Sequence, residues 1–401
     1  MVTVDDGVVA ERPAPGPREV LGVPMLPPAR MLGVVDRLRA ALAALRRAPA
    51  PPPVRVLEAV LAVLDQTALV ALCRAGVPDR LDGPTPLKLL AHDLGVDPDR
   101  LERLLRYGAV RGWVRIDRRG RVRPTPTTTF LRRDHPGGWR AWVEFMGGDE
   151  VARAVGRLDA GLQSGGDPFR AGNGAPFFAW MEQHPQRHAA FDAAMAAGGR
   201  MHGLVLARAL DWSGRGRVCD VGGGTGALLH TLLDARPRLE GVLLELPEVA
   251  ARARPHPRLT TIAGDAFTEV PAGFDTYLLV NVLHDWDDDA AARLLARCAA
   301  VVTTGGAQGV EPRVVIVENR AHRRPRDDLS LRTDLLMLAL TPGGRERSAA
   351  TFDALARPAG LRLARSVPLA SGVAHVLVPV RRPRAARRGA AGRWRPGPGA
   401  A

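Results

Sequence analysis

The sequence predicts an α/β protein in which a mainly helical N-terminal half precedes a parallel, doubly wound sheet. Two observations support this prediction. Much of residues 54–210 places apolar side chains at three- and four-residue spacing, which is typical of amphipathic helices. After residue 216, short apolar, β-rich segments alternate with helical stretches, and this alternation indicates a parallel sheet.

The charge of the chain raises the question of nucleic-acid binding. The 401 residues include 56 Lys+Arg and 42 Asp+Glu, which gives a formal net charge of +14. Lys88 is the only lysine, so the arginine excess is a compositional habit of the whole chain. Residues 381–401 alone hold seven arginines and no acid. The charge total therefore does not favour a nucleic-acid partner.

Length and composition exclude other classes. With 46% hydrophobic residues the chain can bury a large core, and its length suggests about two or three domains. No apolar run approaches the roughly 18 residues of a membrane span, and no secretory signal is visible. The cysteines Cys73, Cys219 and Cys298 show neither a disulfide framework nor metal-ligand spacing. We therefore expect a cytoplasmic protein with no membrane partner and no metal.

Five segments are expected along the chain. Residues 1–53 are a Pro/Arg-rich, largely disordered extension with one helix over 31–47, and residues 381–401 are a basic, disordered tail. Residues 54–138 predict a helix, a helix-turn-helix and a short hairpin, which is a winged-helix pattern. Residues 139–210 predict a helical connector. Residues 211–380 predict the sheet domain.

The sheet domain is expected to contain five parallel strands and a terminal hairpin. The strands are RVCDVGG, RLEGVLLELP, RLTTIAGDAF, FDTYLLVNVLH and RVVIVEN, and the helices between them are GALLHTLLDAR, EVAARARP and DDDAAARLLARCAAVV. A helix over SAATFDALARPAG and two strands with a turn at Ala370–Gly372 follow. Such a hairpin can add an antiparallel edge to the sheet.

A glycine-rich loop follows the first strand. Gly222–Gly226 read GGGTG between that strand and a helix, so the backbone can approach a ligand and the helix N-terminus offers free N–H groups. Glu245 ends the next strand, where a carboxylate can accept hydrogen bonds from ribose hydroxyls. This context favours a nucleotide-type ligand over a plain tight turn. Gly222-x-Gly224-x-x-Ala227 also satisfies a dinucleotide fingerprint, so NAD stays open.

The following strands also end in residues that can bind or react. Asp265-Ala266-Phe267 suits an adenine, with a carboxylate for the exocyclic amine and an aromatic ring for the base. His284 follows the next strand, and an imidazole with a pKa near neutrality suits proton abstraction from a hydroxyl. The alternative is that Asp287 or Asp288 caps the next helix and His284 is merely packed.

Two further carboxylates are candidates for the same site. Glu318 ends the strand VVIVE, and Glu346 lies in the turn GGRER before the last helix. Two carboxylates near one imidazole would orient the ring and raise its basicity. The alternatives are a solvated acid for each and, for Glu346, an acid at a helix N-terminus.

Together these segments resemble the plant-type, caffeate O-methyltransferase-like family and its actinobacterial relatives in secondary metabolism. The resemblance covers roughly residues 55–380 and depends on six motifs in order: DVGGGTGALL, LELPEV, AGDAF, LLVNVLHDWDDD, VVIVEN and LLMLALTPGGRERSAATFDALARPAGL. The stretches GVDPDRLERLLRYGAVRGW and TPTTTFLRRDHPG also look like this family's dimerisation domain.

The resemblance implies a Rossmann-like class I methyltransferase domain, a winged-helix dimerisation domain and a homodimer. It implies S-adenosylmethionine as cofactor and a small aromatic or polyketide-type hydroxyl compound as acceptor. His284 would be the general base, with Glu318 and Glu346 flanking its ring. The implied cofactor-binding residues are Asp220, Gly222, Gly224, Glu245, Asp265, Ala266, Phe267, Asn281, Asp285 and Trp286. The implied substrate-binding residues are Phe191, Met195, Met337 and Thr341.

The chain departs from the family pattern in three ways. Glu245 stands where many members have Asp, and Val280 stands where plant members often have a cationic residue near the cofactor. The N-terminal extension and the arginine-rich tail are not family features.

Three alternative functions remain open at this point. An NAD-dependent oxidoreductase would account for the glycine loop and Glu245 but for none of the later motifs. A winged-helix DNA-binding regulator would use Arg100, Arg103 and Arg106, although the apolar residues of the same helix favour dimer packing over DNA. A family member that has lost methylation is the third alternative, and the retained His284 and its two carboxylates argue against it.

Overall fold

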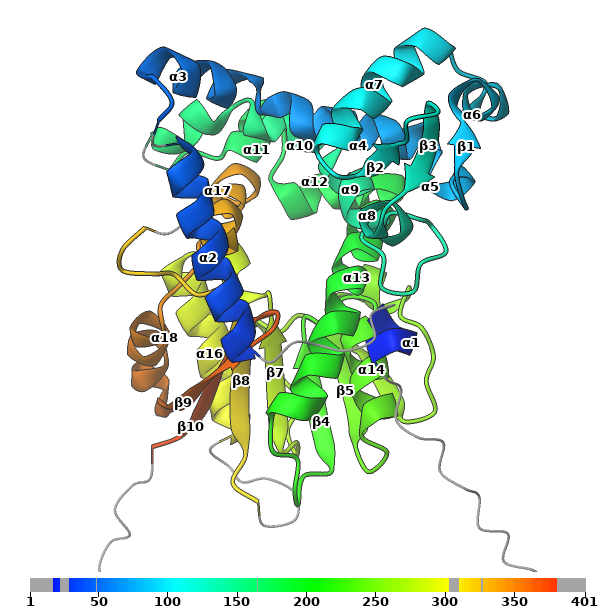
Figure 1. Ribbon diagram of the computed structural model, residues 1–401. Helices are drawn as coiled ribbons and strands as arrows, with labels where there is room; N and C mark the ends of the chain where they lie inside the picture. Colours follow the sequence, from blue (N-terminus) through cyan, green and yellow to red (C-terminus); the bar gives the residue numbers. More distant parts are fainter. Residues whose placement is uncertain are drawn as a thin grey trace, which may run out of the picture.

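The computed structural model describes residues 17–21, 29–47, 49–163, 165–302, 310–325 and 327–380 (Figure 1). Within the N-terminal extension it shows two helices, α1 (Pro17–Leu21) and α2 (Ala29–Arg47). The helix expected over 31–47 is therefore confirmed. The disorder expected for residues 381–401 and for the rest of the extension concerns residues that lie outside the described ones.

The next part of the chain has the expected winged-helix arrangement. Gly95, with φ of 65°, ends the first helix of the helix-turn-helix, and Asp97 caps the second by accepting a hydrogen bond from the Arg100 N–H. Leu101 and Leu105 are buried against the other elements of this part. The elements are α3 (Pro52–Leu61), α4 (Val63–Arg74), α5 (Val77–Arg80), β1 (Thr85–Pro86), α6 (Leu87–Leu94), α7 (Pro98–Val110), β2 (Val114–Ile116) and β3 (Arg121–Pro124). The strands form an antiparallel sheet in the order β1-β3-β2.

Helices α3 and α4 form one apolar segment at the position of the first helix expected in residues 54–138. They are separated only by Ala62, and the 23-residue segment Pro52–Arg74 contains an 18-residue window with a mean hydropathy of 1.9, of which 17% is buried. By length and composition alone this segment could cross a membrane, so the expectation that no apolar run approaches that length was wrong. A single such segment is weak evidence for a membrane protein.

A helical connector leads from the winged helix to the sheet. It contains α8 (Pro126–Phe130), α9 (Arg140–Met146), α10 (Asp149–Val155), η1 (Leu158–Leu162), α11 (Pro168–Asn173), α12 (Phe177–Gln183) and α13 (Pro185–Ala209). In Figure 1, α13 runs from the helical part at the top down beside the sheet. Its apolar and small side chains pack on α14 (Ala227–Ala235), so this long helix joins the two halves of the molecule.

The large sheet has seven strands in the order β6-β5-β4-β7-β8-β10-β9. Five of them are parallel, and β10 pairs antiparallel with β8 and with β9, as expected for a terminal hairpin. The strands are β4 (Arg217–Val221), β5 (Glu240–Glu245), β6 (Leu259–Ala263), β7 (Thr276–Val280), β8 (Arg313–Glu318), β9 (Leu361–Leu369) and β10 (Gly372–Pro379). The remaining elements are α15 (Pro247–Ala250), η2 (Leu283–Asp285), α16 (Asp288–Val302), α17 (Leu329–Leu340), α18 (Ala349–Ala356) and η4 (Arg357–Ala359).

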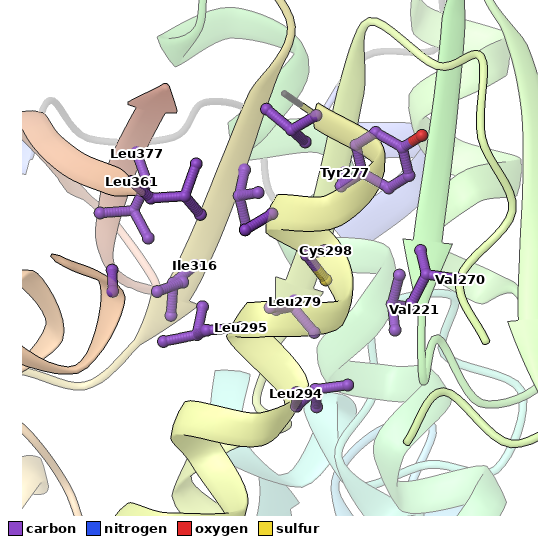
Figure 2. Packing of buried hydrophobic residues seen from close by; sticks show 14 of the residues in the cluster. Val221, Val270, Tyr277, Leu279, Leu294, Leu295, Cys298, Ile316, Leu361 and Leu377 are labelled. Carbon is purple, nitrogen blue, oxygen red and sulfur yellow. The ribbon is translucent and has the colours of Figure 1, made fainter. Parts of the chain in front are cut away.

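Helices cover both faces of this sheet, because alternate residues of each strand point to opposite sides. Tyr277 and Leu279 of β7 face one layer, formed by α16 and α18. Leu278 faces the other, formed by α13 and α14. Figure 2 shows Leu294, Leu295 and Cys298 of α16 packed against side chains of the first face. The fold is thus the predicted doubly wound α/β sheet.

The order of the strands shows where in the fold the candidate site lies. Strand β4 has β5 on one side and β7 on the other, so the chain leaves β4 toward one edge and later returns toward the opposite edge. Ligands of such sheets bind in the crevice beyond the carboxyl ends of the strands at this switch point. The polar residues predicted at successive strand ends therefore lie along one edge.

Candidate active site

The glycine loop and Glu245 meet as the sequence predicts. The Gly224 N–H donates a hydrogen bond of 2.9 Å to Glu245 Oε1, and the Leu246 N–H donates one of 2.8 Å to Oε2. Gly222 and Gly224 have φ of 72° and 61°, the left-handed region that favours glycine. A Cβ built on Gly224 would have no atom within 4 Å, so this side of the loop is open to a ligand.

Asp220 supplies a buried carboxylate behind the same loop. Its side chain is fully buried, and neither of its oxygens has a hydrogen-bond partner among the described residues. Burial, together with the nearby Glu245, raises the pKa of Asp220 to about 7. An unpaired buried carboxylate is costly unless a cationic group meets it. S-adenosylmethionine carries a sulfonium and an ammonium, so the open glycine loop and Asp220 fit that cofactor.

Phe267 and Trp286 form an aromatic wall farther along the edge. Asp265 Oδ1 accepts a hydrogen bond of 2.8 Å from the Phe267 N–H, which fixes the turn after β6. The Phe267 and Trp286 rings meet edge to face at 4.8 Å, and Trp286 stacks on Phe178 of α12 at 6.0 Å. Ala266 packs against the core beside them. The structure thus brings Asp265, Phe267 and Trp286 together and adds Phe178, which no local sequence pattern marks as a site residue.

His284 lies in the short turn η2 after β7, between two carboxylates. Its Nδ1 is 3.5 Å from Glu346 Oε1, and its Nε2 is 3.6 Å from Asp285 Oδ1. The His284 N–H donates a hydrogen bond of 2.9 Å to Glu318 Oε1. Glu346 therefore lies beside the ring, whereas Glu318 contacts the backbone of the same residue.

These carboxylates decide the protonation state of the imidazole. Burial lowers the pKa of His284, but Asp285, Glu346 and Glu318 outweigh burial and raise it to about 9. Burial raises the pKa of Glu318 to about 7 and that of Asp285 to about 6, in both cases against the favourable effect of His284. The carboxylates therefore favour the imidazolium form of the ring at neutral pH.

Glu346 is itself held from two sides. Asn319 Nδ2 donates a hydrogen bond of 3.1 Å to Glu346 Oε1, and the Glu346 N–H donates one of 2.8 Å to Asp334 Oδ1 of α17. Its side chain is only 1% exposed. The alternative of a solvated acid is therefore wrong for Glu346, and Glu318 is likewise fully buried.

The helix-capping alternative is correct for one aspartate of this segment. Asp287 Oδ1 accepts a hydrogen bond of 2.7 Å from the Ala290 N–H at the start of α16. Asp288 instead accepts one from the buried Arg347. Capping by Asp287 and the position of His284 between carboxylates are thus compatible.

Asn281 has an unusual backbone and a buried partner. It has φ of 53°, and it is the only residue other than glycine with a positive φ in the described chain. Its Nδ2 lies 3.3 Å from His202 Nε2, and His202 Nδ1 lies 2.9 Å from Ser371 Oγ. Burial and the charge on His284 lower the pKa of His202 to about 4, so His202 is neutral and its Nε2 can accept from Asn281.

The predicted substrate residues come from two helices. Phe191 and Met195 of α13 pack into an aromatic cluster together with Leu336 and Leu340 of α17. Within that cluster, Phe191 lies 5.2 Å from Phe177 and 5.3 Å from Phe145, measured between ring centroids.

Met337 and Thr341 lie at the C-terminal end of α17. Both are buried, and Thr341 Oγ1 donates a hydrogen bond to the Met337 carbonyl and accepts one from the Gly344 N–H. Thr341 also lines a cavity of about 180 Å³. The other lining residues are Gly161, Gln163, Gly165, Gly166, Leu338, Pro342, Gly343, Gly344 and Arg345. Phe191, Met195 and Met337 are not among its lining residues.

Comparison with known proteins identifies the family to which this chain belongs. The model of an O-methyltransferase domain matches residues 156–362. O-methyltransferase SfmM3 of Streptomyces lavendulae is 33% identical over 322 residues, which cover 78% of this chain and 96% of that protein. The 3-amino-4-hydroxybenzoate 4-O-methyltransferase of Streptomyces cremeus is 33% identical, over 77% of this chain and 85% of that protein.

A solved structure agrees with these sequence relatives. The methyltransferase CalO1 of calicheamicin biosynthesis, solved with S-adenosylhomocysteine bound, has a TM-score of 0.72 and 33% identity. The match covers 86% of this chain and 99% of that chain. The chain therefore belongs to the plant-type family of S-adenosylmethionine-dependent O-methyltransferases, in its actinobacterial secondary-metabolism branch.

Proposed function

We propose that this enzyme methylates a phenolic hydroxyl of a small aromatic or polyketide-type natural product, with His284 as general base. The position of the His284 ring, 13% exposed and lying between Glu346 and Asp285 at the strand-end crevice, is the observation that carries the proposal. The aromatic cluster around Phe191 supports a flat aromatic acceptor. One relative is named for an aminohydroxybenzoate, an aromatic compound that carries a hydroxyl on its ring.

The bound cofactor supplies a methyl group on a positively charged sulfur. We infer that Asp220 and Glu245 hold its cationic and ribose parts and that Asp265, Ala266, Phe267 and Trp286 hold the adenine. Gly222 and Gly224 allow the close approach, while Asn281 and Asp285 border the same crevice. Positioning the two reacting atoms in line accounts for much of the rate in such a displacement.

The proton of the acceptor hydroxyl goes to His284. A phenol with a pKa of about 10 is poorly ionised at pH 7, so a base within reach of the hydroxyl helps, by about 10²–10⁴-fold. With the cofactor bound as methyl donor, the imidazole of His284 would take the O–H proton of the acceptor as its oxygen receives the methyl group. Glu346 then stabilises the imidazolium, and Glu318 fixes the backbone that carries the ring.

Substitution of His284 tests this role. We expect His284→Ala to lower kcat at least tenfold at neutral pH while S-adenosylhomocysteine affinity, measured by calorimetry, stays within about threefold. The assay is transfer of labelled methyl to a panel of hydroxybenzoates and hydroxynaphthoates. His256→Ala, at a histidine that contacts Asp234 and lies outside the site, is the matched control. Unchanged turnover of His284→Ala would exclude the general-base role.

The nicotinamide alternative is wrong, since the family uses S-adenosylmethionine.

We also infer a division of the chain into a dimerisation domain at 54–138, a connector at 139–210 and a catalytic domain at 211–380. The dimer is supported by α3, none of whose residues is buried. The free, buried thiols of Cys73, Cys219 and Cys298 agree with a reducing, cytoplasmic setting.

The structure gives the DNA-binding alternative little support. Arg121 and Arg123 of the wing both donate hydrogen bonds to Asp117, so their charges are partly neutralised. The apolar face of α7 packs into the domain core through Leu101 and Leu105. We therefore keep dimer packing as the proposed role of the winged helix.

A further inference from the structure

Arg347 is a buried arginine that contacts the backbone on both sides of His284. It is 1% exposed, and its guanidinium donates in three directions. Nη1 donates to the Leu283 carbonyl at 2.6 Å, Nη2 to the Trp286 carbonyl at 2.6 Å, and Nε to Asp288 Oδ1 at 2.9 Å. All three acceptors lie in the segment 283–288 that carries the imidazole.

The backbone of Arg347 is fixed independently of this segment. Its carbonyl accepts a hydrogen bond of 3.3 Å from the Ala321 N–H, just after β8. The preceding residue, Glu346, is anchored to Asp334 of α17, and the following residue, Ser348, caps α18. Arg347 therefore connects a rigid part of the domain to a short turn that has little regular structure of its own.

We propose that Arg347 is a positioning residue that sets the distance between the His284 ring and Glu346. Glu346 and Arg347 are neighbours in the chain: one contacts the ring, and the other holds the peptide groups that carry it. Movement of the turn away from Arg347 would therefore also separate His284 from its carboxylate. This inference depends on the proposed function, because it assigns a purpose to the position of the base.

An arginine is needed because its donors lie in a planar fork. Three acceptors in different directions match Nε, Nη1 and Nη2, whereas a lysine ammonium is a compact point charge on a flexible stem. Arg347→Lys thus keeps the charge near Glu318 and His284 but loses the fixed geometry. Arg345→Lys is a matched control: Arg345 lies in the same GGRER turn, is exposed and makes no hydrogen bond or ion pair with any described residue.

The first readout is the pKa of His284, measured by NMR of ring-labelled histidine and assigned with His284→Gln. The groups that face this ring are Asp285, Glu318, Glu346 and His202, and Arg347 lies nearby. Arg347→Lys is expected to lower the pKa of His284 by at least one unit, toward the ordinary value of about 6.5, because the ring moves away from Glu346. A pKa equal to that of Arg345→Lys would overturn the proposal. This readout holds even if His284 is not the base.

The second readout is kcat in a double-mutant cycle. We expect Arg347→Lys to lower kcat at least tenfold in the wild-type background but less than threefold in His284→Gln, because Arg347 acts through that ring. Equal losses in both backgrounds would indicate a merely structural role. If Arg347→Lys does not fold, Asp288→Ala removes one of the three acceptors at a half-exposed position. A smaller pKa shift in the same direction would support the proposal, and no shift would contradict it.

Discussion

His284 must be neutral to act as a base, but the carboxylates around its ring favour the protonated form. An imidazole with a pKa near 9 holds its proton at neutral pH and cannot accept another from a phenol. The raised value comes from Asp285, Glu346 and Glu318, whose combined effect outweighs burial of the ring. A positive charge delivered to the crevice would oppose these carboxylates. Since S-adenosylmethionine carries such a charge, its binding should free the base.

The proton balance of cofactor binding tests this coupling. A nearby cation lowers the pKa of His284, so between the lowered value and about 9 the protein releases a proton on binding. At pH 8, we expect S-adenosylmethionine to release more protons than the neutral S-adenosylhomocysteine. Calorimetry in buffers of different ionisation enthalpy measures both numbers. In His284→Gln the difference should vanish, and equal proton release in the wild-type enzyme would refute the coupling.

The sequence identified the residues at strand ends but few of their partners. Glu245 ends its strand, and Asp265 and His284 lie in the loops that follow theirs. Parallel strands bring their carboxyl ends to one edge, so the proximity of these residues could be predicted. Phe178 and Asn319 reach the site only through tertiary packing, which leaves no local pattern. The position of Arg347 directly after Glu346 in the GGRER turn marks it as a neighbour of the site, but its burial could not be predicted from the sequence.

At the scale of elements, the regular parts were predictable and the boundaries were less so. The alternation of apolar, β-rich segments with helical stretches predicted β4 to β8 and the terminal hairpin, and the central strands β4 and β8 are buried along nearly their whole length. Helix α15 is only one turn, Pro247–Ala250, where a longer helix was expected. The first long helix is divided at Ala62. Such differences depend on packing and hydrogen bonds that the apolar spacing does not record.

The contact of α13 with α14 depends on a glycine. A Cβ built on Gly203 would lie 2.5 Å from the Leu228 carbonyl oxygen and 2.9 Å from Thr231 Cβ. Gly198, in the same helix, has no atom within 4 Å of its Cβ position. The two glycines therefore form a matched pair for substitution by alanine.

We expect opposite effects from the two substitutions. Gly198→Ala should raise the free energy of unfolding by about 0.5–1 kcal/mol, since glycine is a poor helix former. Gly203→Ala should lower it by about 1–3 kcal/mol, because the backbone of α14 must move to admit the methyl group. Denaturant titration compares the variants. A Gly203→Ala protein as stable as Gly198→Ala would show that the two helices separate without cost.

At the scale of the whole molecule, exposed apolar side chains are concentrated in one stretch of the described chain. Of the 23 large hydrophobic residues exposed in the described chain, 13 lie between Met31 and Leu64, on α2, α3 and the start of α4. Soluble monomers rarely expose a contiguous apolar patch of more than a few hundred Å², and larger ones mark interaction sites. A second copy of this chain would cover this surface in the homodimer that we propose, and the same contact would account for the exposed apolar segment Pro52–Arg74.

The oligomeric state tests this reading of the surface. We expect sedimentation equilibrium to give twice the chain mass of 42.9 kDa for the wild-type protein. The double variant Leu57→Asp, Val60→Asp introduces two charges into a face whose residues are 56% and 65% exposed, and it should yield a folded monomer. Val110→Asp, at an 86% exposed residue on α7, should remain a dimer. A double variant that stays dimeric would place the interface elsewhere, because two buried like charges from each copy would oppose association there.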